Sequence, residues 1–134
     1  MNNNTTRIRV TSELDIVRAR EKGRTLAAEL GFSSVDLTAV ATAISELARN
    51  IVIYAHLGDI VLQPLNSGNR CGLLVVASDE GPGIADVSRA LQDGYSSSGS
   101  LGLGLPGTRR LMDEFEIFSQ VGKGTRVTIK KWKR

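Results

Sequence analysis

The sequence predicts an α+β fold, a two-layer sandwich in which helices cover one face of a mixed, mostly antiparallel sheet. One observation is a stripe of apolar residues at helical spacing, which has to be buried against another layer. It comprises Leu37, Val40, Ala41, Ile44, Leu47, Ala48 and Ile51. Another is a pair of strand-like runs, 59–65 and 72–78, on either side of the turn sequence 66–69. Such a pattern is typical of an antiparallel hairpin.

The elements before the stripe follow from local signals. Residues 1–5 are polar and are expected to be frayed. Residues 7–11 alternate as a short strand does. Ser12 and Asp15 resemble a capping box, which predicts that a first helix starts here and runs to Leu30. The next residue is a glycine, which suits the left-handed cap of a helix end.

The second helix and the last strands have similar signals. Ser33 and Asp36 repeat the capping pattern and predict the start of the helix that carries the apolar stripe. Val121 is expected to close a strand, and the glycine-rich turn 122–124 leads into a final strand, 125–132. The chain of 134 residues is long enough for one core, so we expect a single domain over residues 1–134.

The composition argues against several classes of protein. Hydrophobic residues make up 41% and charged residues 23%, as in ordinary globular proteins. The longest apolar runs, such as 73–77, are far shorter than the roughly 20 residues of a membrane-spanning helix. The single Cys71 excludes an internal disulfide. The charge of +3 is scattered, and 3 Phe, 2 Tyr and 1 Trp are too few for a base-stacking surface. We expect a cytoplasmic protein that binds neither membranes nor nucleic acid.

Two polar residues accompany the apolar stripe. Glu46 and Asn50 are four residues apart, so they lie one above the other on the same side of the second helix. An Asn carbonyl oxygen is a suitable ligand for Mg²⁺, and a carboxylate one turn away can orient or deprotonate a hydroxyl group. The pair is a weak signal by itself, because exposed Glu and Asn occur on most helices.

A second group follows an apolar strand directly. Asp79 at the strand end can accept a hydrogen bond from the exocyclic amine of an adenine, and Gly81 and Gly83 have no Cβ to keep the backbone away from the base. A plain strand-ending turn explains these residues equally well.

Two further segments are rich in glycine. Gly102, Leu103 and Gly104 open a helix with Pro106 in its first turn, and the free N–H groups of such a helix end favour an anion. This segment is neither a Walker loop nor a Rossmann fingerprint. Gly124 and Thr125 belong to a hairpin turn whose threonine hydroxyl can point into a pocket.

The order and spacing of these four segments resemble the N, G1, G2 and G3 boxes of the Bergerat (GHKL) ATP-binding family, over nearly the whole chain. Within that family, the segments 43–50, 79–84, 103–107 and 110–115 resemble the RsbT-type serine/threonine switch kinases.

The resemblance implies that the chain binds ATP and Mg²⁺. Asn50 would hold the metal ion against the phosphates, and Glu46 would act as the catalytic base or orienting group. Asp79 would bind the adenine. The implied ATP-binding residues are Asn50, Asp79, Gly81, Gly83, Gly102, Leu103, Gly104 and Thr125. Phosphoryl transfer depends mostly on positioning and electrostatics, so loss of Asn50 or Asp79 should be more damaging than loss of the base.

The resemblance also implies a mobile lid and an external acceptor. Residues 84–101 would be the ATP lid, and Gly94, Gly99 and the serines at 96–98 would let it move. The lone His56 is expected at the end of the second helix, where a cation suits the helix dipole. The chain has no room for the separate helical hairpin that carries the phosphoacceptor of histidine kinases, so the acceptor is expected to be a Ser or Thr of another protein.

By the same resemblance, the substrates would be STAS-domain stressosome proteins, and the released kinase would activate a PP2C-type phosphatase that ultimately frees an alternative sigma factor. Two other interpretations stay open. One is an anti-sigma factor kinase that binds a sigma factor directly, and the other is a non-catalytic nucleotide-sensing scaffold. The basic C-terminal residues 130–134 are expected to form a solvated strand end, with docking of an acidic partner as the alternative.

Overall fold

A computed structural model describes residues 5–92 and 104–134. Its five strands form one sheet in the order β1-β2-β3-β5-β4. They are β1 (Thr6–Val10), β2 (Gly58–Ser67), β3 (Arg70–Asp79), β4 (Glu114–Gln120) and β5 (Gly124–Trp132). The chain enters β2 from β1 through two helices and turns back in hairpins at β2–β3 and β4–β5.

The sheet differs in one respect from the expected mixed arrangement. All four pairs of neighbouring strands in the described residues are antiparallel. The strands β3 and β4 do run in the same direction, but β5 lies between them and pairs with both. The hairpin at residues 122–124 therefore places β5 between β3 and β4, which would otherwise be parallel neighbours.

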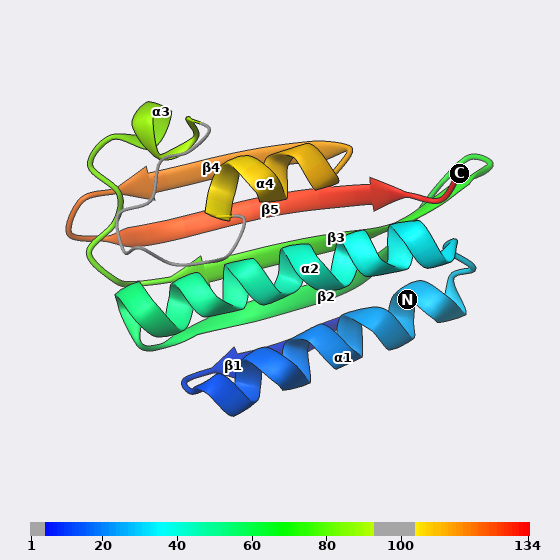
Figure 1. Ribbon diagram of the computed structural model, residues 1–134, viewed down its shortest axis with the longest axis horizontal. Coiled ribbons are helices and arrows are strands. Elements are labelled where there is room, and N and C mark those ends of the chain that lie inside the picture. Colours follow the sequence, from blue (N-terminus) through cyan, green and yellow to red (C-terminus); the bar gives the residue numbers. More distant parts are fainter. Residues whose placement is uncertain (1–4, 93–103) are drawn as a thin grey trace.

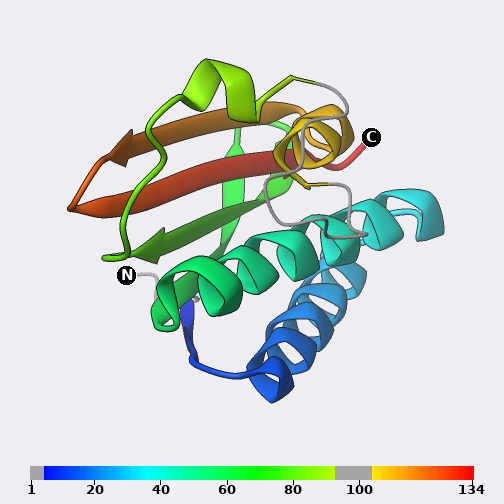
Figure 2. The same ribbon diagram turned by 60° about the vertical axis from the view of Figure 1, so that its left-hand side comes forward.

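The helices form the second layer, as predicted. They are α1 (Glu13–Glu29), α2 (Ser34–Asn50), a π-helical turn η1 (Ile51–Ala55), α3 (Val87–Ala90) and α4 (Gly104–Leu111). Figures 1 and 2 show α1, α2 and α4 side by side over one face of the sheet, with no helix of the described residues on the other face. The predicted α+β two-layer sandwich is confirmed.

The two predicted helix starts are both correct, but they are capped differently. The Ser33 hydroxyl accepts a hydrogen bond from the Asp36 N–H at 3.1 Å, as an N-cap does. At α1 the side chain of Ser12 makes no cap bond. There the carboxylate of Asp15 accepts bonds from the N–H and the hydroxyl of Thr11, at 2.9 and 3.1 Å. The aspartate thus ties the helix to the end of β1.

The apolar stripe of α2 forms the centre of the core. Val40, Ile44, Leu47 and Ile51 are all at most 2% exposed, between the sheet and α1. Gly23 of α1 faces Ile44, and a Cβ at position 23 would overlap the end of that side chain. The glycine therefore lets the two helices pack closely.

The same helix corrects one sequence-based expectation. The stretch Ser34–Ala55, α2 with η1, has 22 residues and a hydropathy of 1.2, and by length and composition alone it is apolar enough to cross a membrane. The core helix of a soluble protein passes the same test, and here 44% of the apolar window is buried inside the fold. Its length arises because one continuous helix spans the sheet.

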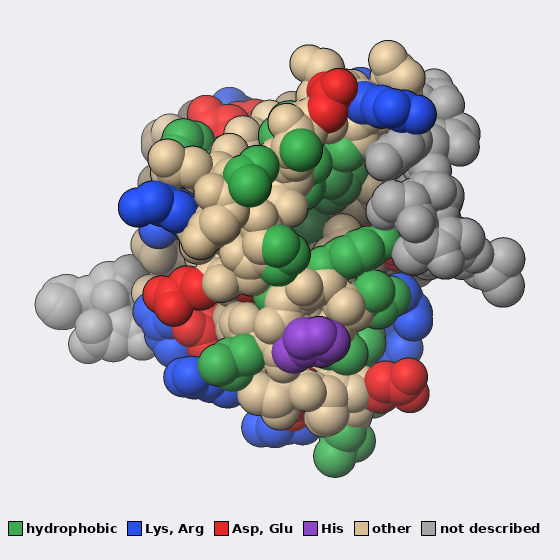
Figure 3. Space-filling view, turned by 90° about the vertical axis from the view of Figure 1, so that its left-hand side faces the viewer, with side chains coloured by type: hydrophobic (Ala, Val, Ile, Leu, Met, Phe, Trp, Pro, Cys, Tyr) green, Lys and Arg blue, Asp and Glu red, His purple; other side chains and the backbone are tan. Residues whose placement is uncertain are grey.

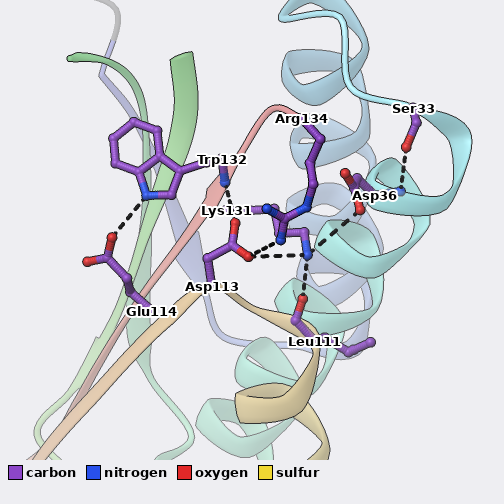
Figure 4. Close-up of polar contacts among 8 residues, drawn as sticks. All are labelled: Ser33, Asp36, Leu111, Asp113, Glu114, Lys131, Trp132 and Arg134. Carbon is purple, nitrogen blue, oxygen red and sulfur yellow. Dashed lines mark hydrogen bonds and ion pairs between the residues drawn. The ribbon is translucent and has the colours of Figure 1, made fainter. Parts of the chain in front are cut away.

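The C-terminal end of β5 corrects a second expectation, that residues 130–134 form a solvated strand end. Lys131 follows Val127 and Ile129 in the row that faces the helices, and its side chain is 10% exposed. Its ammonium donates to the carbonyl of Leu111 at 3.0 Å and lies 3.7 Å from Asp36 and 3.8 Å from Asp113 (Figure 4). The basic residues are therefore not simply a solvated strand end, because strand alternation turns this lysine inward.

Next to it, Trp132 is 8% exposed although it lies on the face without helices. Its indole N–H donates to Glu114 at 2.9 Å, and the guanidinium of Arg70 lies 4.1 Å from the ring centre. These polar side chains cover the ring in place of a helix.

Asp113 joins this end of the sheet to α4. Its carboxylate accepts a bond from the backbone N–H of Trp132 at 2.7 Å and is paired with Arg134 and Lys131 (Figure 4). Burial alone would raise the pKa of Asp113, but the Trp132 hydrogen bond and the two cations outweigh it, so the pKa is lowered.

This shift gives a pH-dependent stability. A carboxyl group with a lowered pKa in the folded state stabilises the protein above its unfolded pKa, about 3.9, and the contribution disappears as the pH falls through the folded value. Asp113→Asn should lower the stability at pH 7 by about 1 kcal/mol, and less at pH 3.5. Thermal unfolding at both values measures the difference. Glu116→Gln, on the exposed side of β4, is the control, and an effect of Asp113→Asn that does not depend on pH would contradict the assignment.

Candidate nucleotide-binding site

The predicted catalytic carboxylate lies against the start of α4. Glu46 of α2 is 8% exposed, and its Oε1 accepts a hydrogen bond from the backbone N–H of Gly104 at 3.3 Å. Gly104 is the first residue of α4 and has a positive φ of 67°. A negative charge at this end of a helix is favoured by the free N–H groups and the helix dipole. Thus the fold brings together two of the sequence-predicted segments that are 58 residues apart.

Asn50 is the last residue of α2 and is half-buried, one turn beyond Glu46. The helix then widens into the π-helical turn η1, which ends at His56 in the left-handed conformation with φ of 69°. The N–H of His56 donates to the carbonyl of Ile51 at 2.7 Å. The sequence located this helix end correctly, but nothing in it indicated the π turn. Such turns are frequent at functional sites.

Figure 3 looks onto this end of the molecule. Apolar side chains gather around the single histidine, and the surface beside them is hollowed. The exposed apolar side chains contributed by this region are Ile53, Tyr54 and Leu57, at 41 to 45%.

The predicted adenine-binding segment starts at the end of β3. Asp79 is the last residue of that strand, and its Oδ1 accepts a bond from the N–H of Gly81 at 2.9 Å. A Cβ at Gly81 would lie 2.6 Å from the Cβ of Ala55, closer than real Cβ atoms come. Glycine is therefore required for this loop to pack on η1, and the packing joins the loop to the C-terminal end of α2.

The β4–β5 hairpin supports the same loop from the other side. Thr125 is paired with Asp79 across β3 and β5, and its hydroxyl lies 2.8 Å from that of Ser119. Ser119 also accepts a bond from the N–H of Ile84 at 2.7 Å. At Gly83, φ is 79° and a Cβ would overlap the carbonyl of Gln120. These contacts hold the loop against the hairpin.

Ser119 is a site residue that the sequence analysis missed. It follows Phe115 and Ile117 at alternate positions of β4, on the side that faces the helices. A polar residue that continues an inward-facing apolar row is the signal that indicates such a role.

Several predicted residues cannot be compared with the structure. Gly102 and Leu103 lie outside the described residues, as do Gly94, Gly99 and the serines at 96–98. Of the predicted lid, 84–101, the described part ends at residue 92 and contains α3. The Asp86 carboxylate caps α3 by accepting from the Arg89 N–H at 3.0 Å.

The metal-binding capacity of the site rests on few groups. Within residues 5–92 and 104–134, no group of three or more His, Cys, Asp or Glu side chains is placed to hold a metal ion. A protein cage for a metal is therefore not part of the described structure. Mg²⁺ typically binds through one or two protein oxygens together with water and substrate phosphates, and Asn50 is the oxygen ligand that the sequence predicts.

A second hollow lies on the opposite face of the sheet. It has a volume of about 460 Å³, and its lining includes Arg9, Ser78, Phe118 and Arg126 together with Asp79 and Thr125. Strand alternation puts Ser78 and Arg126 on the face away from α2, whereas Asp79 and Thr125 point the other way. This hollow therefore opens mainly on the opposite face of the sheet, but its lining also includes Asp79 and Thr125 of the predicted nucleotide site.

Comparison with known proteins agrees with the fold. The profile of the histidine kinase-like ATPase domain matches residues 10–131. The serine/threonine-protein kinase RsbT of Bacillus subtilis is 50% identical over 127 residues, which cover 95% of this chain and 96% of that protein. The anti-sigma F factor of Thermoanaerobacter sp. is 32% identical over 85% of this chain and 82% of its own length.

A solved structure has the same fold. The RsbU and RsbW domains of Rv1364c from Mycobacterium tuberculosis superpose with a TM-score of 0.63 and 19% identity. The match covers 96% of this chain but only 33% of that longer one. With near-complete coverage by both the family profile and RsbT, this chain belongs to the histidine kinase-like ATPase family and, within it, is a serine/threonine-protein kinase of the RsbT type.

Proposed function

We propose that this kinase binds ATP with Mg²⁺ between α2, η1, the loop after β3 and the start of α4. The observation that carries the proposal is the contact of Glu46 with the N-terminus of α4, because it joins the predicted catalytic helix to the predicted phosphate-binding segment. Asp79 would hold the adenine. One of its carboxylate oxygens is bonded to Gly81, and the other would accept the exocyclic amine of the base.

The phosphate end would be formed by α4 and α2. The first N–H groups of α4, with Gly102 and Leu103 before them, would bind phosphate oxygens. Asn50 would hold Mg²⁺, which supplies charge neutralisation for the transferring phosphoryl group. Glu46 would orient the attacking hydroxyl or take its proton, because a buried carboxylate beside the phosphates would be close enough to hydrogen-bond that hydroxyl.

The substrate would be a Ser or Thr of a STAS-domain stressosome protein. Once released, the kinase would bind and activate a PP2C-type phosphatase in a cascade that regulates a sigma factor in the cytoplasm. The 50% identity with RsbT, over nearly the full length of both chains, supports this assignment over other members of the family.

The rival is an anti-sigma factor kinase that binds a sigma factor directly. It is favoured by the 32% identity with an anti-sigma F factor. A non-catalytic nucleotide-sensing scaffold is the remaining alternative, and it is disfavoured because Glu46 and Asn50 are both present.

The adenine contact can be tested by binding. Asp79→Asn should weaken ATP binding by about tenfold or more, because it removes a charged hydrogen-bond acceptor for the amine and disturbs the bond to Gly81. Isothermal titration with Mg-ATP measures the change. Ser78→Ala, one residue earlier and on the opposite face, is the matched control. Equal affinities of Asp79→Asn and wild type would exclude this adenine site.

The catalytic roles can be tested by transfer of label from γ-labelled ATP to candidate STAS-domain proteins. Asn50→Ala should reduce transfer by more than about 100-fold and Glu46→Gln by less, since positioning and charge neutralisation dominate phosphoryl transfer. Thr38→Ala, an exposed position of the same helix, should match wild type.

The outcome also separates the alternatives. Label on a partner Ser or Thr that disappears in Asn50→Ala supports the kinase assignment. Capture of a sigma factor with no labelled STAS protein favours the anti-sigma alternative, and ATP binding without any label favours the scaffold.

A further inference from the structure

The short helix α4 is attached to α2 at both of its ends. At the first end, the N–H of Gly104 donates to Glu46 of α2. At the last, the carbonyl of Leu111 accepts a bond from Lys131, whose ammonium lies 3.7 Å from Asp36 in the first turn of α2 (Figure 4). The lysine is thus a bridge between the end of α4 and the start of α2.

Burial makes this lysine unusual. The residue as a whole is 8% exposed, and a buried ammonium group is costly unless it is paired and hydrogen-bonded. An apolar residue that continued the inward row of Val127 and Ile129 would fill the same place without that cost. The polar contacts of Lys131, and not its burial, therefore explain the residue.

The contacts also have consequences for α4. With eight residues the helix is about 12 Å long, well below the length at which a helix is stable alone. Its position consequently depends on its attachments. A cation at the last carbonyls of the helix also interacts favourably with the helix dipole. Because a helix this short moves as one rod, what holds Leu111 also determines where Gly104 lies relative to Glu46.

We propose that Lys131, held by Asp36, is a positioning residue that aligns the N-terminus of α4 for the phosphates of ATP. The inference rests on the proposed function, in which α4 binds phosphate. It assigns to Lys131 no contact with the nucleotide: it acts through α4, from the opposite end of that helix.

We call the contact of Lys131 with Asp36 and Leu111 the clamp. The test compares ATP with adenosine, because the clamp acts on the phosphate end of the site and leaves the Asp79 end unchanged. Lys131→Met and Asp36→Asn should raise the dissociation constant of Mg-ATP roughly fivefold to tenfold and leave that of adenosine within about twofold of wild type. The constants are measured by titration, with adenosine in competition where it binds weakly. Lys130→Met is the matched control, since this neighbour lies on the other face and pairs with Glu114.

Stability is measured alongside. Asp36→Asn leaves Lys131 paired with Asp113 and bonded to Leu111. This variant therefore tests the proposal even if Lys131→Met does not fold. A purely structural role would lower the melting temperature and leave the ratio of ATP to adenosine affinity unchanged, and that result would overturn the proposal. If Asp79→Asn also fails to weaken ATP binding, the nucleotide site itself is wrong. If Asp79→Asn weakens it and the clamp variants behave as Lys130→Met, only the clamp is wrong.

Discussion

The packing of α2 on the sheet is the constraint on which the rest of the molecule depends. Ile44 and Leu47 of this helix are at most 2% exposed. Glu46, which lies between them in the sequence, is 8% exposed. Successive residues are turned by about 100° around a helix, so any rotation that exposed the carboxylate more would pull an apolar side chain out of the core. Burial of the stripe therefore fixes where Glu46 and Asn50 emerge, and core packing and site geometry share one cause.

The π turn extends this constraint to the loop after β3. A regular helix would have continued from Asn50, but η1 widens the last turn and brings Ala55 against Gly81. The loop is held from the other side by Ser119, which bonds to Ile84 and Thr125. The loop thus lies between a helix end and a hairpin, and its shape is determined by both.

Much of this could be predicted from the sequence because the signals are local. The periodicity of α2, the cap formed by Ser33 and Asp36 and the turn at 66–69 each depend on residues close together in the chain. The four glycine-rich and polar segments became informative through their order. By contrast, the inward lysine at 131, the role of Ser119 and the insertion of β5 between β3 and β4 depend on contacts between distant residues. The alternation of each strand marks such residues as inward-facing, but their partners come from other elements.

The contact between Glu46 and Gly104 bears on how a nucleotide would enter the proposed site. The N–H of Gly104 already points at an oxygen atom, so a phosphate oxygen would replace a carboxylate oxygen and not bulk water. The donor is then oriented before binding, which reduces the cost of ordering it. The same event would release the carboxylate from α4 and leave it free beside the phosphates, where a base or orienting group is needed. In the proposed site, this one hydrogen bond would order the start of α4 before ATP binds, and its exchange for a phosphate would free Glu46 for its proposed catalytic role.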